Sequence, residues 1–193
     1  MRNRSWRSAG VTEKTDPALE SAAGGLAGSV PAFRVGLGYD AHRFAPDRAL
    51  VLGGVRLREQ DGLLGHSDAD VLVHAIMDAL LGAAGLEDIG HYFPDTDPAY
   101  AGADSMDLLE AVVTLLSDRG WRAVNVDAMV ICEEPRIAPH RGAMRARLAE
   151  ALGVGVEAVG LRGTTTEGMG FTGRREGIAA QAVALVERVA ATA

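Results

Sequence analysis

The segment from residue 69 to residue 84 constrains the fold most, because its apolar side chains recur at the spacing of an α-helix. Six of them fall on one stripe: Leu72, Ala75, Ile76, Ala79, Leu80 and Ala83. Gly85 follows directly and is a typical helix-ending residue, since glycine adopts a left-handed backbone without a steric penalty. The sequence therefore predicts a helix over 69–84 with one face in a core.

Strand-like and helix-like segments alternate along the rest of the chain. The patterns predict strands over 34–42, 49–58, 122–132 and 158–166, with a turn at Pro46-Asp47 and a bend at Gly53-Gly54. Helices are expected over 104–118 and 138–152, closed near Gly120 and Gly153, a polar loop over 86–103 and a Gly-rich turn over 168–173. The Ala- and Val-rich segment 176–190 fits either a strand or a helix. Strands mixed with helices in one compact chain predict an α/β or α+β fold.

Residues 1–32 differ in composition from the rest of the chain. They are rich in Ser, Gly, Ala and Thr and show no sustained period, so we expect a disordered tail followed by one domain over 33–193. A secretory signal would need an apolar core of about 7–15 residues in this stretch. Charged residues interrupt it instead, and the sequence predicts no such signal.

Charge and cysteine content narrow the class of protein. The net charge is −7 with no block of like charges, which argues against nucleic acid as the principal partner. No run of about 18 apolar residues occurs, so no membrane-spanning helix is expected. Cys132 is the only cysteine, which excludes an intramolecular disulfide and indicates either a reducing compartment or a chain that is indifferent to redox conditions. We expect a cytoplasmic protein of bacterial type rather than a plastid protein.

Asp40, His42 and His74 are candidate metal ligands. Asp40 and His42 are two residues apart, which places both side chains on one face of the expected strand. A carboxylate beside an imidazole suits Zn²⁺, although a structural Asp–His hydrogen bond explains the same pair. His74 lies off the apolar stripe of its helix and faces either solvent or a site, and Asp78 is spaced to orient it or to form an ordinary surface pair. Two His and one Asp would match a reactive zinc centre.

Two further segments have the composition of phosphate-binding sites. Residues 65–70 lie at the start of the 69–84 helix, and Ser67 or Asp68 is the expected N-cap. Free backbone N–H groups at a helix start can bind phosphate. Helix capping alone, however, also explains why Ser and Asp occur here. Residues 164–174 combine hydroxyls, a carboxylate, glycines and an Arg suited to bidentate phosphate contact, although a hairpin loop has a similar composition. The two aspartates of the loop 93–98 either orient ligands or form turns.

Taken in order, these segments resemble the 2-C-methyl-D-erythritol 2,4-cyclodiphosphate synthase family over about residues 34–189. The match runs through Gly38-Tyr-Asp-Ala-His42, His66-Ser-Asp-Ala-Asp70, the helix with His74, Asp88-Ile-Gly90, Phe93-Pro-Asp-Thr-Asp97, Thr164-Thr-Thr-Glu167 and Gly170-Phe-Thr-Gly-Arg174. The resemblance implies a lyase of the non-mevalonate isoprenoid route. In its reaction, the 2-phosphate of 4-diphosphocytidyl-2-C-methyl-D-erythritol 2-phosphate attacks the β-phosphoryl group, the ring closes to the cyclodiphosphate, and CMP leaves.

The resemblance also implies roles for individual residues. Asp40, His42 and His74 would hold Zn²⁺, Glu167 would hold a second divalent ion (Mg²⁺ or Mn²⁺), and His66 and Thr165 would act on the phosphates. The methylerythritol-phosphate side would be formed by Asp40, His42, His66, Ser67, Asp88, Ile89, Gly90, Phe93, Pro94, Asp95, Thr96 and Asp97. The cytidine side would be formed by Cys132, Pro135, Arg136, Ile137, Ala138, Thr164, Thr165, Thr166 and Glu167. Cys132 would then be a pocket neighbour and not a nucleophile.

The resemblance further implies a fold and an assembly. The fold is a single α+β domain, a mixed β-sheet of about four main strands with helices on one face, assembling as a homotrimer. Active sites would lie at subunit interfaces, with metal-side and nucleotide-side residues from different chains. Phe171 and Arg174 would line a central cavity for isoprenoid diphosphates, and a substrate-site role for either stays open. Arg136 and Gly168 depart from the pattern, since lysine is common at both positions, and Gly168 removes a cation.

Overall fold

A mixed β-sheet forms the centre of the protein. The computed structural model describes residues 32–189, so the expected tail over 1–32 lies outside the described residues except for Ala32. The sheet has the strand order β4-β1-β7-β5-β6. Its strands are β1 (Phe33–Ala45), β4 (Gly62–Leu63), β5 (Trp121–Ile131), β6 (Val159–Thr164) and β7 (Gly177–Arg188). β5 and β6 are parallel, and the other neighbours are antiparallel.

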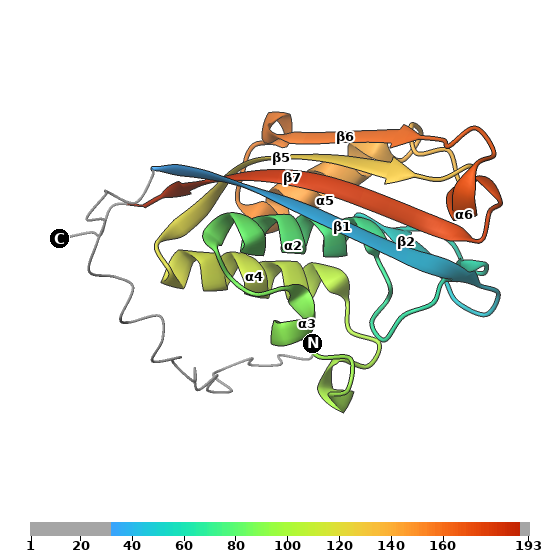
Figure 1. Cartoon of the computed structure of the whole chain (residues 1–193), viewed down its shortest axis with the longest axis horizontal. Helices are drawn as coiled ribbons and strands as arrows, with labels where there is room; N and C mark the ends of the chain where they lie inside the picture. The colour runs from blue at the N-terminus through green and yellow to red at the C-terminus, as the bar shows by residue number, and fades with distance from the viewer. Residues whose placement is uncertain (1–31, 190–193) are drawn as a thin grey trace. The chain divides into compact units, whose positions relative to one another are not determined.

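Three long helices cover one face of this sheet (Figure 1). They are α2 (Val71–Ala84), α4 (Ser105–Asp118) and α5 (Arg141–Leu152). The shorter elements are the hairpin of β2 (Leu50–Leu52) and β3 (Val55–Arg58), α3 (Ile89–Tyr92), η2 (Pro98–Tyr100), η3 (Val156–Ala158) and α6 (Gly170–Gly173). The arrangement confirms the expected α+β domain with four main strands and helices on one face.

β7 resolves the one ambiguous segment of the sequence as a strand. Every second residue from Ile178 to Val186 is buried, and three of these residues are alanines. β7 pairs with β1 on one side and with β5 on the other, so two neighbours satisfy its backbone groups. An Ala-rich composition favours a helix locally, but pairing on both edges outweighs that preference here.

α2 lies directly on the backbone of β1. A Cβ atom added to Gly36 would lie 2.0 Å from the Ala79 carbonyl oxygen, and one added to Gly38 would lie 1.9 Å from the Ala75 carbonyl oxygen. Only glycine permits this approach, because both obstacles are backbone atoms of the helix. The contact matters for function, since it fixes the strand of Asp40 and His42 against the helix of His74.

Replacing Gly38 by alanine should lower the free energy of unfolding by about 3 kcal/mol or more, because overpacking against a rigid backbone cannot be relieved by a side-chain rotation. The matched control is Gly142→Ala, since Gly142 is in α5 and a Cβ there would meet nothing within 4 Å. That change should stabilise the helix by about 0.5–1 kcal/mol. Urea unfolding monitored by circular dichroism measures both, and equal effects of the two variants would contradict the close-approach explanation.

Local details differ from the sequence-based expectations in three places. The N-cap of α2 is Asp70 and not Ser67 or Asp68; its carboxylate accepts from the Val73 N–H at 3.2 Å and from the Gly54 N–H at 2.7 Å. Burial raises the pKa of Asp70 to about 6. The expected Gly-rich turn over 168–173 contains the one-turn helix α6, and the expected loop over 86–103 contains α3 and η2. The caps and stops at Gly85 and Gly153 are as expected, both with left-handed backbones.

The second face of the sheet carries exposed apolar side chains. Phe33, Val35, Leu37 and Tyr39 of β1 point to this face and are 54–66% exposed, and Val183 of β7, paired with Leu37, is 43% exposed. β5, expected to be a buried strand, is fully buried on one side only, since the residues that alternate with Val126, Ala128 and Val130 are half-buried. No helix within residues 32–189 is long and apolar enough to cross a membrane.

Candidate active site and metal centre

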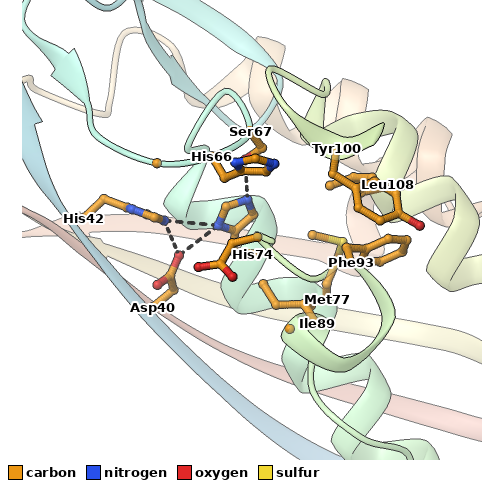
Figure 2. A pocket seen from close by; sticks show the side chains of 13 residues that line it. Asp40, His42, His66, Ser67, His74, Met77, Ile89, Phe93, Tyr100 and Leu108 are labelled. Atoms are coloured by element: carbon orange, nitrogen blue, oxygen red, sulfur yellow. Dashed lines mark hydrogen bonds and ion pairs between the residues drawn. The ribbon is translucent and has the colours of Figure 1, made fainter. Parts of the chain in front are cut away.

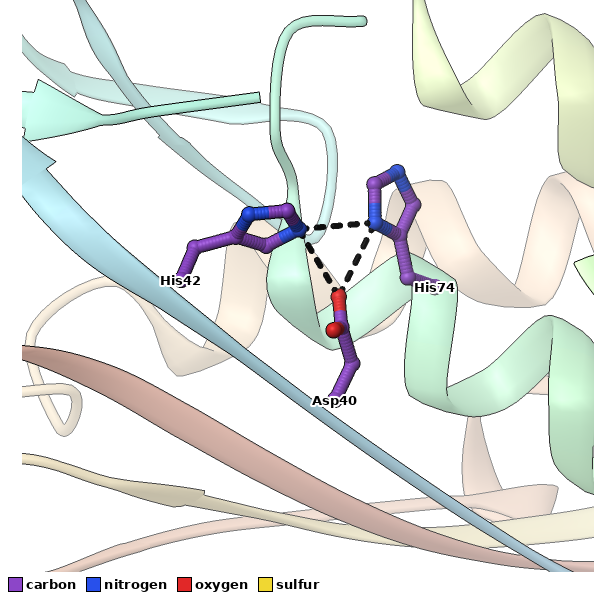
Figure 3. A group of neighbouring side chains, drawn as sticks. All are labelled: Asp40, His42 and His74. Carbon is purple, nitrogen blue, oxygen red and sulfur yellow. Dashed lines mark hydrogen bonds and ion pairs between the residues drawn. The ribbon is translucent and has the colours of Figure 1, made fainter. Parts of the chain in front are cut away.

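Asp40, His42 and His74 converge on one point between β1 and α2 (Figure 3). Oδ2 of Asp40 lies 2.9 Å from Nε2 of His42 and 3.0 Å from Nδ1 of His74. The two ring nitrogens are 3.2 Å apart. Within residues 32–189 this is the only group of three or more His, Cys, Asp or Glu side chains close enough to share an ion. The fold thus joins residues that are more than 30 positions apart in the chain.

The hydrogen bonds around the triad leave metal-binding atoms facing inward. Nδ1 of His42 lies 2.7 Å from the Leu64 carbonyl oxygen, which only accepts, so Nδ1 carries the proton and Nε2 presents its lone pair to the triad. Two imidazole nitrogens and one carboxylate oxygen form a donor set that suits Zn²⁺ and leaves further positions open for substrate or water. The residues present therefore fit a catalytic divalent ion.

Electrostatics within the triad also favour a cation. Burial disfavours the ionised form of Asp40, but its contacts with the rings of His42 and His74 outweigh burial and hold the pKa of the Asp40 carboxyl well below its usual range. Burial likewise opposes the charged form of His42, yet its hydrogen bond with Asp40 prevails and raises the pKa of the ring. Asp40 is thus a carboxylate at neutral pH, as a metal ligand must be.

A cavity of about 420 Å³ opens beside the triad (Figure 2). Nine residues predicted from the sequence line it: Asp40, His42, His66, Ser67, His74, Ile89, Gly90, Phe93 and Asp95. Gly65, from the expected phosphate-binding segment 65–70, also lines it, whereas Met77, Tyr100 and Leu108 line it and were missed. Tyr100 stacks edge-to-face on Phe93 with ring centroids 5.4 Å apart. The Asp97-Pro98 start of η2 is a local signal that could have placed Tyr100 on a short helix.

The loop that carries His66 and Ser67 is held by Arg48. The Arg48 guanidinium donates to the Gly65 carbonyl at 2.9 Å and also to the Ser67 carbonyl. Nε2 of His66 lies 3.1 Å from the Asp97 carbonyl, so this loop and the 93–98 loop are tied together. Arg48 had no assigned role from the sequence, because nothing local to it marks its partners.

Several predicted residues support the cavity wall without lining it. The Asp88 carboxylate caps α3 by accepting from the His91 N–H at 3.0 Å, and Asp97 caps η2 by accepting from the Ala99 N–H at 2.9 Å. Pro94 and Thr96 also lie outside the lining. Asp78 accepts from the Ile89 N–H at 2.9 Å and makes no hydrogen bond to His74 in the described structure, so the expected orienting role of Asp78 is wrong. Burial raises the pKa of Asp78.

A second cavity, of about 390 Å³, lies at the ends of β5 and β6 and is lined by seven of the nine predicted cytidine-side residues, with Thr166 and Glu167 outside the lining. Its lining comprises Cys132, Glu133, Pro135, Arg136, Ile137, Ala138, Arg141, Arg162, Gly163, Thr164 and Thr165. The Cys132 thiol donates to the Pro135 carbonyl at 3.4 Å, and burial raises its pKa to about 11. A thiol that stays protonated is a poor nucleophile, which agrees with its expected role as a neighbour. The two cavities share no lining residue.

The 164–174 loop is fixed by its own side chains. Glu133 accepts from the Thr166 and Gly168 N–H groups, both at 3.2 Å. Thr165 Oγ1 donates to Glu167 Oε1 at 2.7 Å, which holds the exposed Glu167 carboxylate beside the second cavity. Farther along, a cavity of about 360 Å³ is lined by Ala41, His42, Arg43, Leu64, Phe171 and Glu176. Arg174 lies next to it and pairs with Glu176 at 2.6 Å.

A model of the YgbB family matches residues 33–187, nearly all of the described domain. The chain belongs to the YgbB family. A YgbB-type relative, the 2-C-methyl-D-erythritol 2,4-cyclodiphosphate synthase of Rubrobacter xylanophilus, is 62% identical over 163 residues, covering 83% of this chain and 98% of the relative. Both cavities and the triad fall inside the YgbB match.

Solved structures resemble the YgbB domain closely. The bifunctional IspDF of Campylobacter jejuni aligns with a TM-score of 0.78 at 38% identity, covering 81% of this chain and 42% of that longer chain. The Plasmodium falciparum IspF in complex with CDP aligns with a TM-score of 0.73 at 30% identity, covering 84% of this chain and all of that chain.

Proposed function

We propose that this YgbB-family chain is a 2-C-methyl-D-erythritol 2,4-cyclodiphosphate synthase of the isoprenoid pathway. The substrate is 4-diphosphocytidyl-2-C-methyl-D-erythritol 2-phosphate, and the products are the cyclodiphosphate and CMP. The observation that carries the proposal is the convergence of Asp40, His42 and His74 at the mouth of a cavity that also contains His66 and Ser67. Relatives with about 60% identity bear the name of this enzyme.

The reaction joins one phosphate to another without water. An oxygen of the 2-phosphate attacks the β-phosphorus, the bond from that phosphorus to the bridging oxygen breaks, and CMP leaves with this oxygen. Two anions must be brought together and their charge neutralised, which is the purpose of a divalent ion as clamp and Lewis acid. His66 and Ser67 line the cavity, from where they can contact phosphate oxygens, and the 93–98 loop encloses the methylerythritol end.

Purified protein supplied with Zn²⁺ and Mg²⁺ should release CMP and form the cyclic diphosphate in equal amounts. Phosphorus-31 NMR distinguishes the cyclic product from a linear one, and chromatography quantifies CMP. Reaction in oxygen-18 water should place no label in the product, because the nucleophile is a phosphate oxygen. CMP release with only linear, labelled products would instead identify a metal-dependent phosphohydrolase and overturn the proposal.

We also propose that Glu167 holds a second divalent ion, Mg²⁺ or Mn²⁺, on the nucleotide side. Its carboxylate is exposed and steadied by Thr165, and a solved relative is described as a CDP complex. Oxygen ligands of this kind suit hard cations. Residues from Cys132 to Ala138 and from Thr164 to Thr166, most of which line the second cavity, would then hold the cytidine, with Arg136 near the phosphates.

Glu167→Gln should lower kcat by about 10²-fold or more, because the amide keeps the shape but loses the negative charge that holds a cation. Zinc content should stay at one ion per chain, since Asp40, His42 and His74 are untouched. Steady-state kinetics with a Mg²⁺ titration, together with elemental analysis, measure both effects. Glu150→Gln is the control, as Glu150 is exposed on α5, and it should behave as wild type. A Glu167 variant with unchanged Mg²⁺ dependence would contradict the assignment.

A homotrimer fits the uncovered sheet face. Phe33, Val35, Leu37 and Tyr39 form an exposed apolar row, and burial of such a row against other copies stabilises an assembly. Because the metal-side and nucleotide-side cavities share no residue, we propose that each active site combines the first cavity of one chain with the second cavity of its neighbour.

The cavity around Phe171 and Arg43 is proposed to take an isoprenoid diphosphate at the centre of the trimer, with the apolar tail beside Phe171 and the diphosphate near Arg174. A cytoplasmic location is proposed as well, supported by the bacterial origin of relatives with about 60% identity, such as that of Rubrobacter xylanophilus. A small-molecule substrate and further copies of this chain are then the partners of the protein.

A further inference from the structure

A chain of hydrogen bonds runs from His74 away from the metal centre. Nε2 of His74, the ring nitrogen opposite the triad, lies 3.0 Å from Oγ of Ser105. Ser105 Oγ lies 2.5 Å from Oδ1 of Asp68, and Oδ2 of Asp68 accepts from the Ser105 backbone N–H at 3.1 Å. Ser105 is fully buried. Neither Ser105 nor Asp68 was predicted to take part in the metal site.

Neither Ser105 nor Asp68 is the N-cap of an adjacent helix. The N-cap of α4 is Asp104, whose carboxylate accepts from the Met106 N–H at 2.9 Å. The N-cap of α2 is Asp70. Oδ1 of Asp68 also accepts from the Asp70 N–H at 3.2 Å, and beyond these backbone contacts the Asp68 carboxylate is joined to Ser105 Oγ, which in turn contacts His74.

The hydrogen bonds that join Asp68, Ser105 and His74 have a fixed direction of donation. An ionised carboxylate accepts hydrogen bonds and donates none, so the Ser105 hydroxyl must point its proton at Asp68. The Ser105 oxygen then offers a lone pair to His74, which makes Nε2 the protonated nitrogen of that ring. Nδ1 is left with its lone pair facing Asp40 and His42, as a metal ligand requires.

We propose that Asp68 and Ser105 are positioning residues that hold His74 in its metal-binding tautomer and thereby set the affinity of the site for a divalent cation. The proposal rests on the metal site of the proposed function. Ser67 is a weaker substitute for Ser105, because its Oγ lies 3.2 Å from His74 Nε2 and already accepts from the Ala69 N–H (Figure 2). Loss of the Ser105 hydroxyl alone should therefore lower zinc affinity less than a reversal of the hydrogen-bond direction.

Asp68→Asn should reverse the direction of hydrogen-bond donation between residue 68, Ser105 and His74. With its oxygen on the Ser105 backbone N–H, the Asn side chain directs its amide group at Ser105 Oγ and gives up the weaker contact that Asp68 Oδ1 accepts from the Asp70 N–H at 3.2 Å. Ser105 then donates to Nε2 of His74 and forces the proton onto Nδ1, the nitrogen that should bind the metal. Zinc affinity, measured by chelator competition on the folded protein, should fall by about 10–100-fold in Asp68→Asn and by about 5-fold in Ser105→Ala.

The double variant separates this role from a merely structural one. Adding Ser105→Ala to Asp68→Asn removes the reversed donor, and His74 can again donate to Ser67, so zinc affinity should recover relative to Asp68→Asn alone. A structural role predicts the opposite, since two disruptions would add. Asp104→Asn is the matched control: it is the same change next to Ser105, Asn is an equally good N-cap, and zinc affinity should equal that of wild type.

Circular dichroism reports whether each variant folds, and if Asp68→Asn does not, Ser105→Ala carries the test. Unchanged zinc affinity in Ser105→Ala, or a double variant that binds no more tightly than Asp68→Asn, would overturn the positioning role while leaving the cyclase proposal intact. Wild-type protein that binds no zinc would overturn both. A smaller loss of zinc affinity in Ser105→Ala than in Asp68→Asn, together with recovery of affinity in the double variant, would support the proposal.

Discussion

Replacing His42 or His74 by alanine should remove the zinc ion and abolish turnover. Each variant leaves two ligands where a reactive zinc centre needs three, and Asp40 loses one of the two rings that hold its carboxylate. With the cation gone, nothing neutralises the approaching phosphates, and we expect kcat to fall by about 10³-fold or more. Elemental analysis of the purified variants and CMP release measure the two effects.

The control for the histidine variants is His91→Ala. His91 is exposed on α3, lines neither cavity and contacts the Tyr92 ring, so its removal should leave one zinc per chain. Retention of one zinc per chain in His42→Ala or His74→Ala would refute the ligand assignment. Loss of zinc with full turnover would instead show that the metal is dispensable for the reaction.

Leu37→Asp should convert the proposed trimer into monomers and abolish activity. Leu37 is 61% exposed at the middle of the apolar row on β1. Burying a leucine contributes about 1.5–3 kcal/mol, and an unpaired aspartate buried in its place costs several kcal/mol more. A symmetric assembly repeats this penalty in each copy. Sedimentation or light scattering measures the mass, and the monomer should keep the circular dichroism spectrum of the wild type.

Val156→Asp is the matched control, because Val156 is an apolar residue of η3 that is 47% exposed and lies outside the sheet. It should leave the mass and the activity unchanged.

A shared site adds a second test: co-expressed His42→Ala and Glu167→Gln chains, each inactive alone, should regain about a quarter of wild-type activity, since random mixing pairs intact halves in that fraction of sites. A fully active Leu37→Asp monomer would exclude active sites shared between chains.

The helices and the ligand-bearing strand could be predicted because their signals are local. The apolar stripe of α2, the stop at Gly85 and the same-face placement of Asp40 and His42 depend only on residues a few positions apart. The strand β7 could not be assigned, because its alanines favour a helix until pairing with β1 and β5 is counted. The N-cap of α2 was misplaced for a similar reason: Asp70 also binds the N–H of Gly54, which belongs to a separate hairpin.

The sequence by itself determined the element types around the site, the donor types available to a metal and the family resemblance. Only the tertiary structure brought His74 within 3.0 Å of Asp40, placed Ser105 and Asp68 behind the ring, and left one sheet face of β1 uncovered. The physical reason is the separation along the sequence over which each interaction acts. Periodicity and capping act within one or two turns of the chain, whereas the close packing of α2 on Gly36 and Gly38 sets how residues 34 positions apart meet.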